Sequence, residues 1–587
     1  MVTLYINNTK VEVEQGSTIL DAASSAGVRI PTMCHVEGRV PQGACRVCVV
    51  EVEGARTLVA SCCTPATENM KVFTNTKRVR QARRNVVELL LSEHDGDCKT
   101  CERNNDCELQ ELARQLGIDE VSYQGERTTG RIDDSTPALT RDAGKCIKCR
   151  RCVTVCTEMQ AVGSLFPQGR GFHSMIGPAF TCELGDVVCV QCGQCSAICP
   201  VGAISEKSHI DDVWAAIDNP EKFVVVQTAP AIRAALGECF GMEPGTLVTG
   251  RMVTALRQLG FDGVFDTNFT ADLTIMEEGT ELLMRLKKAL VDKQPVALPQ
   301  YTSCCPGWIK FAEHYYPEIL PNLSSCKSPQ QMFGAVAKTY YAEKIGRRPE
   351  DMVVVSVMPC TAKKFENQRP EMNDSGLRDV DYVLTTRELG RMIRQAGIDF
   401  DLLKDSAMDS PLGMSSGAAD IFANTGGVME AAIRTAYEIV TQKELPADNL
   451  HVKPIMGLDG VKTASLKIEG AVGDWAFLEG AELKVAVVHT LANARKIIDA
   501  VSKGEVFHFI EVMSCPGGCI SGAGQPRFTD DRIRLKRIEA IYKEDEGKKL
   551  RKSHLNPEVL QIYKEFLGEP LSRRSHKLLH TQYVERA

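Results

Sequence analysis

Short apolar runs alternate with amphipathic stretches along most of the chain after about residue 210. The apolar runs are FVVVQTAP, PVALPQYTSCC, VVVSVMPC, KVAVVHT and HFIEVMSC, which begin at residues 223, 295, 353, 484 and 508. Stretches of helical periodicity include SPQQMFGAVAKTYYAEKIG, TTRELGRMIRQAG and GVMEAAIRTAYEIVTQK, which begin at residues 328, 385 and 427. Strands separated by helices predict one large α/β domain with a parallel sheet.

The two ends of the chain have patterns of their own. The N-terminus reads as two strands joined at Asn7–Asn8, followed by a helix over 18–27 with Ser17 as its N-cap. A longer amphipathic helix is predicted over 77–93. Near the C-terminus, Asn556 followed by Pro557 marks a helix start.

Composition and charge exclude several classes of protein. A chain of 587 residues is expected to hold about three to five domains. Its net charge of −7 gives no basic surface for nucleic acid. Because no apolar run approaches the ~18 residues of a membrane span and the start MVTLYINNTK reads as a strand rather than a signal peptide, we expect a cytoplasmic protein.

The 24 cysteines carry most of the chemical information. They cluster at metal-ligand spacings, and a reducing compartment disfavours disulfides, so bound metal is the favoured interpretation.

Three cysteine-bearing segments follow predicted strands: TSCCPGW at 302–308, MPCTAKKFE at 358–366 and EVMSCPGGCISGAGQP at 511–526. The carboxyl ends of parallel strands gather at one edge of a sheet, so five cysteines should converge there. These are Cys304, Cys305, Cys360, Cys515 and Cys519. Four thiolates predict an iron–sulfur cluster, and one thiol is left over.

Two runs at 146–156 and 189–200 have the C-x2-C-x2-C-x3-C spacing of bacterial two-cluster ferredoxins, although Thr157 replaces the proline of the first run. The fourth cysteine of each run ligates the other cluster. One predicted set is therefore Cys146, Cys149, Cys152 and Cys199, and the other is Cys189, Cys192, Cys195 and Cys156. Cys182 lies outside both runs and is expected to be a buried free thiol.

Two further ligand sets precede these runs. Cys34, Cys45, Cys48 and Cys62 are spaced C-x10-C-x2-C-x13-C, with Cys63 as an alternative fourth ligand and a zinc ribbon as an alternative site. His94, Cys98, Cys101 and Cys107 follow the predicted helix over 77–93. One imidazole and three thiolates suit either zinc or an iron–sulfur cluster.

The three C-terminal cysteine loops, in their order and spacing, closely resemble the signature loops of the [FeFe]-hydrogenases, and the resemblance runs essentially from end to end. It implies a multidomain α/β protein. The implied domains are a [2Fe-2S] ferredoxin-like β-grasp domain over 1–77, a His-ligated [4Fe-4S] domain over 78–125, a two-[4Fe-4S] ferredoxin domain over 138–209, an active-site domain over 210–545 and a C-terminal helical belt over 546–587.

The resemblance also implies the cofactors. Cys305, Cys360, Cys515 and Cys519 would hold the [4Fe-4S] part of an H-cluster, and Cys519 would bridge to a di-iron unit carrying CO, cyanide and a dithiolate amine. Maturation enzymes would supply that unit. One [2Fe-2S] and three further [4Fe-4S] clusters, one of them with a histidine ligand, would carry electrons between the surface and the active site.

Roles for the remaining site residues follow from the same resemblance. Cys304 would relay protons, since a free thiol with a pKa near ~8.5 exchanges protons readily at neutral pH. The proton path would continue through Glu278, Ser324, Glu281 and Arg285. Lys363 would donate to a cyanide, and Met358, Met513 and Pro230 would line the pocket. His576 and His580 in the tail are expected to be surface or packing residues.

Two positions depart from many relatives. Ala231 stands where a serine is common after Pro230, and Ser514 stands where an alanine is common before Cys515. Because hydrogen bonds to cluster ligands tune reduction potential, we expect these changes to alter the balance between hydrogen oxidation and proton reduction.

The sequence indicates the electron-transfer partners of the chain less clearly than it indicates the cofactors. The N-terminus resembles the large electron-transfer subunit of respiratory complex I and the chains that join flavin-bearing and thioredoxin-like [2Fe-2S] subunits. This favours an NAD(P)-linked complex, which would bifurcate electrons if ferredoxin also takes part. The alternatives are a stand-alone ferredoxin-dependent hydrogenase and, from another class, a non-catalytic iron–sulfur sensor or assembly factor. No GxGxxG fingerprint follows a predicted strand, so the chain is not expected to bind NAD itself.

Overall fold

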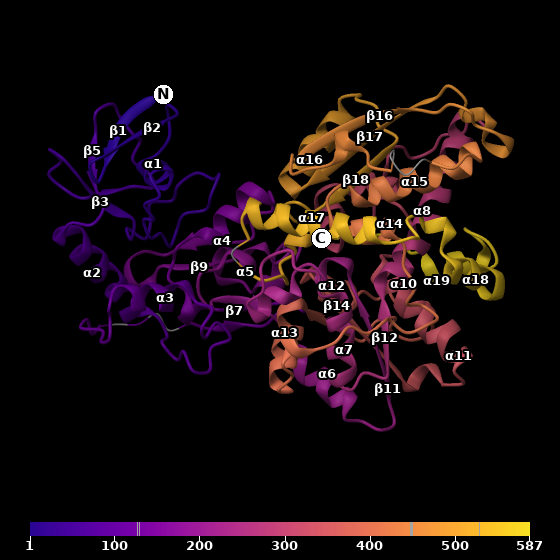
Figure 1. Ribbon diagram of the computed structural model, residues 1–587, viewed down its shortest axis with the longest axis horizontal. Helices are drawn as coiled ribbons and strands as arrows, with labels where there is room; N and C mark the ends of the chain where they lie inside the picture. Colours follow the sequence, from indigo (N-terminus) through magenta and orange to yellow (C-terminus); the bar gives the residue numbers. More distant parts are fainter. Residues whose placement is uncertain (126, 128–129, 446–449, 528, 587) are drawn as a thin grey trace. The chain divides into compact units, whose positions relative to one another are not determined.

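The computed structural model describes residues 1–125, 127, 130–445, 450–527 and 529–586 (Figure 1). These residues form two compact units. The first comprises Met1–Cys189 and Gln194–Ser205, and the second comprises Val190–Gly193 and Glu206–Ala587.

The first unit begins with a five-stranded mixed sheet in the order β2-β1-β5-β3-β4, which packs against helix α1. The elements are β1 Val2–Ile6, β2 Thr9–Val13, α1 Ile19–Ser25, β3 Val49–Val52, β4 Val59–Ala60 and β5 Lys71–Phe73. The N-cap of α1 is Thr18 rather than the expected Ser17. The Thr18 side chain accepts a hydrogen bond from Asp21 N, and the Asp21 carboxylate accepts one from Thr18 N, so the two residues form a capping box.

Helices and short strands complete the first unit. Helix α2 spans Lys77–Glu93 and ends at His94, as its apolar periodicity predicted. The remaining elements are α3 Glu108–Gln115, β6 Ile132–Asp133, β7 Leu139–Asp142, α4 Arg151–Thr154, β8 Phe166–Gln168, β9 Met175–Gly177, α5 Gln194–Ile198 and β10 Ile204–Glu206.

The second unit contains two four-stranded sheets where the sequence predicted one. The first has the order β12-β11-β14-β15 with all strands parallel, and the second has the order β13-β18-β17-β16 with β16 antiparallel. The strands are β11 Phe223–Thr228, β12 Gly263–Asp266, β13 Gln300–Tyr301, β14 Met352–Met358, β15 Tyr382–Thr385, β16 Val461–Lys467, β17 Glu482–His489 and β18 Phe509–Met513. In Figure 1 the two groups of strands are separated within the unit.

Fourteen helices of the described residues connect and cover these sheets. They are α6 Ile210–Ile217, α7 Thr249–Gln258, α8 Thr267–Leu290, α9 Pro306–Tyr315, α10 Pro329–Val336, α11 Ala342–Lys344, α12 Ala362–Glu366, α13 Thr386–Gln395, α14 Gly417–Asp420, α15 Gly427–Thr441, α16 Leu491–Ser502, α17 Asp531–Gly547, α18 Pro557–Ile562 and α19 Arg573–Leu579. The predicted helix starts at Pro557, and the Asn556 side chain caps it by accepting from Glu558 N.

Burial explains why the central strands form. Val224, Val225 and Val226 on β11 are at most 1 % exposed, so both faces of this parallel strand are covered. β13 is much shorter than the apolar run that predicted it. Pro295 and Pro299 have no N–H donor for a β-ladder, which confines the pairing to Gln300–Tyr301.

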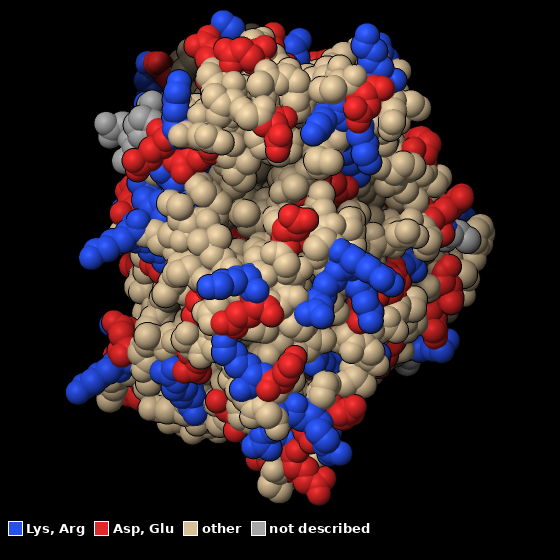
Figure 2. Space-filling view, turned by 90° about the vertical axis from the view of Figure 1, so that its right-hand side faces the viewer, with Lys and Arg blue, Asp and Glu red and all other residues tan. Residues whose placement is uncertain are grey.

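Surface charge and helix character are the last two features of the fold. On the face of the molecule shown in Figure 2, basic and acidic side chains are interspersed rather than gathered in patches of one sign. Among the described residues, no helix combines the length and apolar character needed to cross a membrane.

Candidate active site

Three loops of the second unit bring four cysteines together. Cys305 immediately precedes α9, Cys360 follows β14, and the other two follow β18. Burial, and then the charge of neighbouring Cys305, raises the pKa of Cys360 to about 12. Burial followed by these neighbours also raises the pKa of Cys515 and that of Cys519. Four crowded thiols, of which Cys515 is buried and the other three are half-buried, gain stability as thiolates only when cations bind them. This donor set therefore fits an iron–sulfur cluster.

Two buried side-chain amides of the second unit have no hydrogen-bond partner within the described part of the chain, and one of them adjoins the cysteine loops. The side-chain amide N and O atoms of both Asn424 and Gln331 are buried and have no hydrogen-bond partner among the described residues. Thr425 N donates to Gly517 O at 3.0 Å, which places the Asn424 loop beside the Cys515–Cys519 loop. Buried amides without partners are rare in folded proteins and indicate a ligand or water at the site. No pattern in the sequence pointed to Gln331, whereas the glycines that follow Asn424 indicate a tight loop at that position.

The loop backbone at Gly518 leaves no room for a side chain. Gly518 has φ of +97°, and a Cβ there would lie 2.5 Å from Thr425 N. Glycine is therefore required, both by the left-handed backbone and by the close approach of the two loops.

Ser514 contacts Cys305, a predicted cluster ligand, directly. Its Oγ lies 3.2 Å from Cys305 Sγ, and its backbone N donates to the same sulfur at 3.4 Å. Ala231 is fully buried on the short helix Pro230–Ile232, and its carbonyl accepts from Gln525 Nε2 at 3.0 Å. The serine at position 514, where alanine is common in relatives, thus places a hydroxyl at hydrogen-bond distance from a predicted cubane ligand.

Other predicted pocket residues are buried close to the cysteine loops. Met358 ends β14 and Met513 ends β18, and each is 2 % exposed. Lys363 on α12 donates to the Cys304 carbonyl at 3.1 Å and to Glu366 Oε2 at 2.9 Å. Burial lowers the pKa of Lys363, but Glu366 and then Cys304 and Cys360 together raise it above its usual value, so the ammonium stays charged.

The predicted proton path lies along helix α8 and the segment after β13. Arg285 Nη2 donates to Glu281 Oε1 at 2.7 Å, and Ser324 Oγ donates to Glu281 Oε2 at 3.2 Å. Glu278 is 2 % exposed, and burial is the main cause that raises its pKa to about 8. A carboxyl group with that pKa is protonated at neutral pH and can pass a proton on.

Cys304 departs from the expectation of an ordinary thiol pKa. Desolvation, and then the Glu278 carboxylate, raise its pKa well above the usual value. Cys304 therefore interacts electrostatically with Glu278, which lies on α8 together with Glu281. The group is therefore a protonated thiol, suited to donate rather than to stand as a free thiolate.

The first unit brings Cys34, Cys45, Cys48 and Cys62 together in its interior. Cys48 Sγ lies 3.3 Å from Cys62 Sγ, and hydrogen bonding from Cys45 and Cys62 lowers the pKa of Cys34. Cys62 is 1 % exposed, whereas Cys63 is exposed. This geometry favours Cys62 over Cys63 as the fourth ligand.

A second thiol group of the first unit lines one cavity, formed by Cys146, Cys149, Cys152 and Cys199. Burial raises the pKa of Cys146 to about 11 and that of Cys149 to about 12. In the other predicted ferredoxin set, Cys156 Sγ accepts from Ser164 N at 3.3 Å. The ligand roles of Cys189, Cys192 and Cys195 stay predictions. Cys182 is exposed, so the expectation that it is buried was wrong.

His94 caps the C-terminus of α2 and is 8 % exposed. Burial lowers its pKa, which keeps the imidazole neutral and able to ligate a metal. Burial, and more weakly Cys101, raise the pKa of Cys107, so these two thiols lie near each other. Cys98 is exposed on the turn that leads to Cys101.

Comparison with family models covers most of the chain. Residues 222–523 match the model described as iron only hydrogenase large subunit, C-terminal domain, and residues 531–586 match iron hydrogenase small subunit. Residues 1–77 match a 2Fe-2S iron-sulfur cluster binding domain. Residues 83–122 match the NADH-ubiquinone oxidoreductase-G iron-sulfur binding region.

Individual relatives extend over the same length. NADP-reducing hydrogenase subunit HndD of Solidesulfovibrio fructosivorans is 52 % identical, over 100 % of this chain and 99 % of its own. Iron hydrogenase 1 of Clostridium pasteurianum is 41 % identical, over 99 % and 100 %. A structure of apo [FeFe]-hydrogenase HydA1 from Chlamydomonas reinhardtii is 44 % identical, covers 65 % of this chain and 99 % of its own, and superposes with a TM-score of 0.58.

Proposed function

The chain belongs to the iron-only, or [FeFe], hydrogenase large-subunit family, and we propose that it is the hydrogen-converting subunit of an NAD(P)-linked complex. It is an oxidoreductase acting on H2, and its reaction is the reversible reduction of two protons to H2. Its cofactors are an H-cluster together with [2Fe-2S] and [4Fe-4S] clusters. The predictions of family, function, enzyme class and cofactor types are thereby confirmed.

The cofactor supplies the redox chemistry, and the polypeptide supplies ligands, protons and electrons. We assign Cys305, Cys360, Cys515 and Cys519 as the ligands of the active-site cubane, which their mutual proximity in buried loops supports. Met358, Met513, Pro230 and Ala231 would line the pocket, and Lys363 would present its ammonium to an anionic ligand. Gln331 and Asn424 join this group because their amides are buried without partners among the described residues.

Protons would move along Cys304, Glu278, Ser324, Glu281 and Arg285. The chain of contacts along α8 supports this order, since Ser324 and Arg285 both donate to Glu281. Glu278 interacts electrostatically both with Glu281 and with Cys304, and its raised pKa would let it carry a proton at neutral pH.

Electrons would reach the active site through four accessory clusters held in the domains predicted over 1–77, 78–125 and 138–209. The gathered thiols of the first unit support a [2Fe-2S] cluster in a β-grasp domain and one cubane of the two-cluster ferredoxin domain. The buried neutral His94 supports a cluster with one histidine ligand. The domains over 210–545 and 546–587 would hold the active site and its helical belt.

The observation that favours an NAD(P)-linked complex is the end-to-end similarity, at 52 % identity, to a subunit named for NADP reduction. The partners would be a flavin- and iron–sulfur-bearing subunit that reacts with NAD(P)H and a thioredoxin-like [2Fe-2S] subunit, in the cytoplasm. Maturation enzymes would install the di-iron unit. Ferredoxin would be a further electron partner if the complex bifurcates electrons.

Anaerobic purification of the tagged chain from its own cells tests this proposal. We expect flavin and additional iron–sulfur subunits to copurify, and the complex to reduce NADP+ or NAD+ with H2. A chain that purifies alone and exchanges electrons only with ferredoxin would contradict the complex and favour the stand-alone enzyme. A sensor or assembly factor is disfavoured because the third ligand loop and Cys304 are both present.

A further inference from the structure

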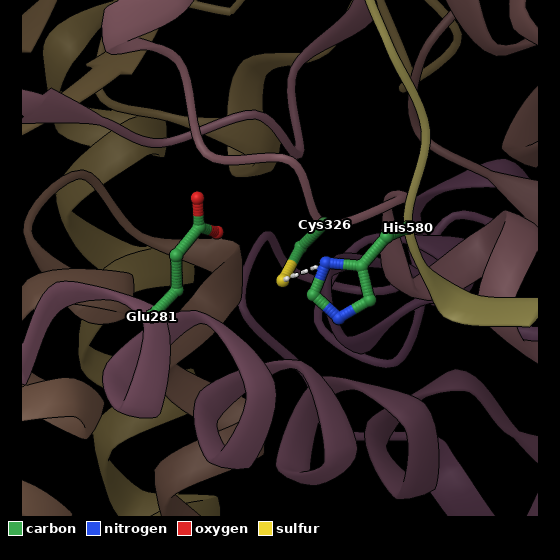
Figure 3. Close-up of side chains that lie close together, drawn as sticks. All are labelled: Glu281, Cys326 and His580. Carbon is green, nitrogen blue, oxygen red and sulfur yellow. Dashed lines mark hydrogen bonds between the residues drawn. The ribbon is translucent and has the colours of Figure 1, made fainter. Parts of the chain in front are cut away.

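Three side chains outside the predicted ligand sets meet in the interior of the second unit: Glu281, Cys326 and His580 (Figure 3). One ligand atom from each lies within 4.8 Å of the other two. Cys326 Sγ is 4.0 Å from His580 Nδ1. Figure 3 shows the side chains entering this space from three separate segments. A carboxylate, a thiol and an imidazole form a donor set suited to a borderline metal ion such as Zn²⁺.

The backbone holds two of these residues opposite each other. Cys326 and His580 form an antiparallel β-bridge. On either side of it, Lys327 N donates to Leu579 O at 2.8 Å and Thr581 N donates to Ser325 O at 2.7 Å. Glu281 projects from α8. Glu281 is therefore held by a helix, and Cys326 and His580 are held by two segments that hydrogen-bond to each other. Such rigid backbone keeps the three ligand atoms at nearly fixed separations.

A buried carboxylate orients the imidazole. His580 Nε2 lies 3.1 Å from Glu277 Oε2, and Tyr563 Oη and Leu571 N also donate to the Glu277 carboxylate, at 2.6 Å and 2.8 Å. Glu277 accepts from Nε2–H of His580, so the lone pair of the neutral ring lies on Nδ1. Nδ1 lies 2.8 Å from Ser325 Oγ and 4.0 Å from Cys326 Sγ, so a bound metal would displace the Ser325 hydroxyl from this nitrogen. Carboxylate–histidine pairs of this kind fix the tautomer and raise the basicity of metal-ligating histidines.

The other two donors can rearrange without leaving a buried charge unpaired. Arg285 donates to Glu281, but it also donates to the carbonyls of Ala297 at 3.0 Å and Leu323 at 2.8 Å, so it keeps partners if Glu281 turns to a metal. Cys326 is fully buried, and burial followed by the Glu281 charge raises its pKa well above the usual value. Without a metal it is a neutral thiol, and coordination would release its proton to solvent as the sulfur–metal bond forms.

We propose that Glu281, Cys326 and His580 form a regulatory site for a Zn²⁺-class divalent cation, with Glu277 as the residue that positions His580. A bound cation would withdraw the Glu281 carboxylate from Ser324 and Arg285. This consequence rests on the proton path of the proposed function, in which Glu281 is the outer carboxylate. Occupancy would therefore slow hydrogen turnover, and removal of the metal would restore it. His580, expected from sequence to be a packing or surface residue, gains a ligand role.

The test adds one equivalent of ZnCl2 to the anaerobic holoenzyme. The bound zinc is examined by X-ray absorption at its K-edge, and viologen-linked hydrogen evolution is measured over a zinc series. Cys326→Ser removes the sulfur ligand, and His580→Gln removes the imidazole if the first variant folds poorly. Cys182→Ser is the matched control, because it removes an exposed thiol outside the site. Each variant's inhibition is expressed relative to its own zinc-free rate.

We expect a first shell with one sulfur and one imidazole nitrogen, which Cys326→Ser changes and Cys182→Ser does not. The half-inhibitory zinc concentration should rise at least tenfold in Cys326→Ser. Glu277→Gln should raise it roughly 10–100-fold with the sulfur still bound, as outer-shell partners of ligating histidines do. The same zinc spectrum in wild type and Cys326→Ser would overturn the site.

One further outcome separates the two proposals. Zinc bound through Cys326 with undiminished turnover would overturn the inhibitory role. Turnover by Glu281→Gln without added metal tests the proton path independently. A slow Glu281→Gln enzyme with no zinc bound at Cys326 in wild type would keep the proton path and reject the metal site.

Discussion

Cys304 and Cys305 are neighbours in the chain but have different assignments, one as proton donor and the other as cluster ligand. Cys304→Ser replaces the thiol by a weaker acid in the same position. We expect hydrogen turnover to fall by about 10²–10⁴-fold, the usual contribution of a positioned acid or base, while the infrared bands of the active-site cofactor remain. Cys239→Ser is the control, since Cys239 is also a thiol whose pKa burial raises to about 11. Equal turnover in both variants would contradict the relay.

Glu278 links pH to stability as well as to turnover. Its pKa is raised from 4.5 to about 8, so the folded state holds a proton that the unfolded state releases between these values. Stability is therefore lost as pH rises through that window. Glu278→Gln removes the titrating carboxyl group and with it this loss of stability. The free energy of unfolding of the variant, relative to wild type, should therefore grow by about 1.4 kcal/mol per pH unit between pH ~5 and ~8.

Anaerobic thermal unfolding of Glu278→Gln and wild type across pH 5 to 8.5 measures this effect. The difference in Tm should increase with pH, while turnover of the variant should be low throughout. A Tm difference that does not depend on pH would show that Glu278 titrates normally, and the proton path would lose its central carrier.

Ser514 offers a hydrogen bond to Cys305 Sγ at 3.2 Å. A donor to a cluster sulfur stabilises the more negative, reduced cluster, so Ser514→Ala should lower the potential. A bond worth about 0.5–1.5 kcal/mol corresponds to roughly 20–65 mV for one electron. Redox titration followed by electron paramagnetic resonance measures the shift, with Ser375→Ala as a control whose hydroxyl bonds a loop carbonyl.

The same substitution tests the expected effect on catalytic bias. Film voltammetry of Ser514→Ala and Ala231→Ser should show a changed ratio of hydrogen oxidation to proton reduction. An unchanged ratio in both variants would reject the idea that these two departures set the bias.

Which residue contacts follow from sequence depends on their separation along the chain. Glu281 and Arg285 are four residues apart on a helix, and their pairing was predicted. The meeting of Glu281 with Cys326 and His580 joins segments about 45 and 300 residues apart, and no local pattern encodes it. Cys182 was expected to be buried because free thiols usually are, yet it is exposed directly after the short helix Ala179–Thr181.

At the scale of elements, the sequence indicated which segments form buried strands more clearly than it indicated which strands pair. The run over 353–360 gave β14, and the helical pattern over 385–397 gave α13. Hydrophobicity marks a strand as buried but does not say which strand lies next to it, so the division into two sheets was missed. β12, β15 and β16 were also missed. β16 alternates exposed positions with one buried and two half-buried ones, and the buried one is Lys462, so its apolar signal is weak.

The cap of helix α1 gives a prediction at this scale. Thr18→Ala removes the side-chain oxygen that accepts from Asp21 N, and should destabilise the first sheet by about 1 kcal/mol. Ser17→Ala, one residue earlier, should change stability by only a few tenths of that. Chemical unfolding followed by loss of [2Fe-2S] absorbance compares the two. A larger loss of stability in Ser17→Ala than in Thr18→Ala would contradict this assignment and favour Ser17 as the N-cap.

At the scale of the whole molecule, the chain has gathered thiols in its first unit and a four-cysteine site in its second. The two units together match iron-only hydrogenase and iron–sulfur family models over most of their length. Cysteine spacing predicted the types of cluster that these family models describe, because metal ligands must lie at short, fixed separations. Partner subunits are recognised by surface side chains, which have no fixed spacing along the chain. The sequence pattern therefore indicates the partners less clearly than it indicates the metal ligands.

The most direct test of the account is an anaerobic hydrogen assay with a viologen dye, combined with infrared spectroscopy, on protein made with the maturation enzymes. We predict hydrogen turnover together with CO and cyanide bands, and neither in protein made without those enzymes. Matured protein with intact accessory clusters but no turnover and no bands would contradict the assignment of Cys305, Cys360, Cys515 and Cys519 as a catalytic centre.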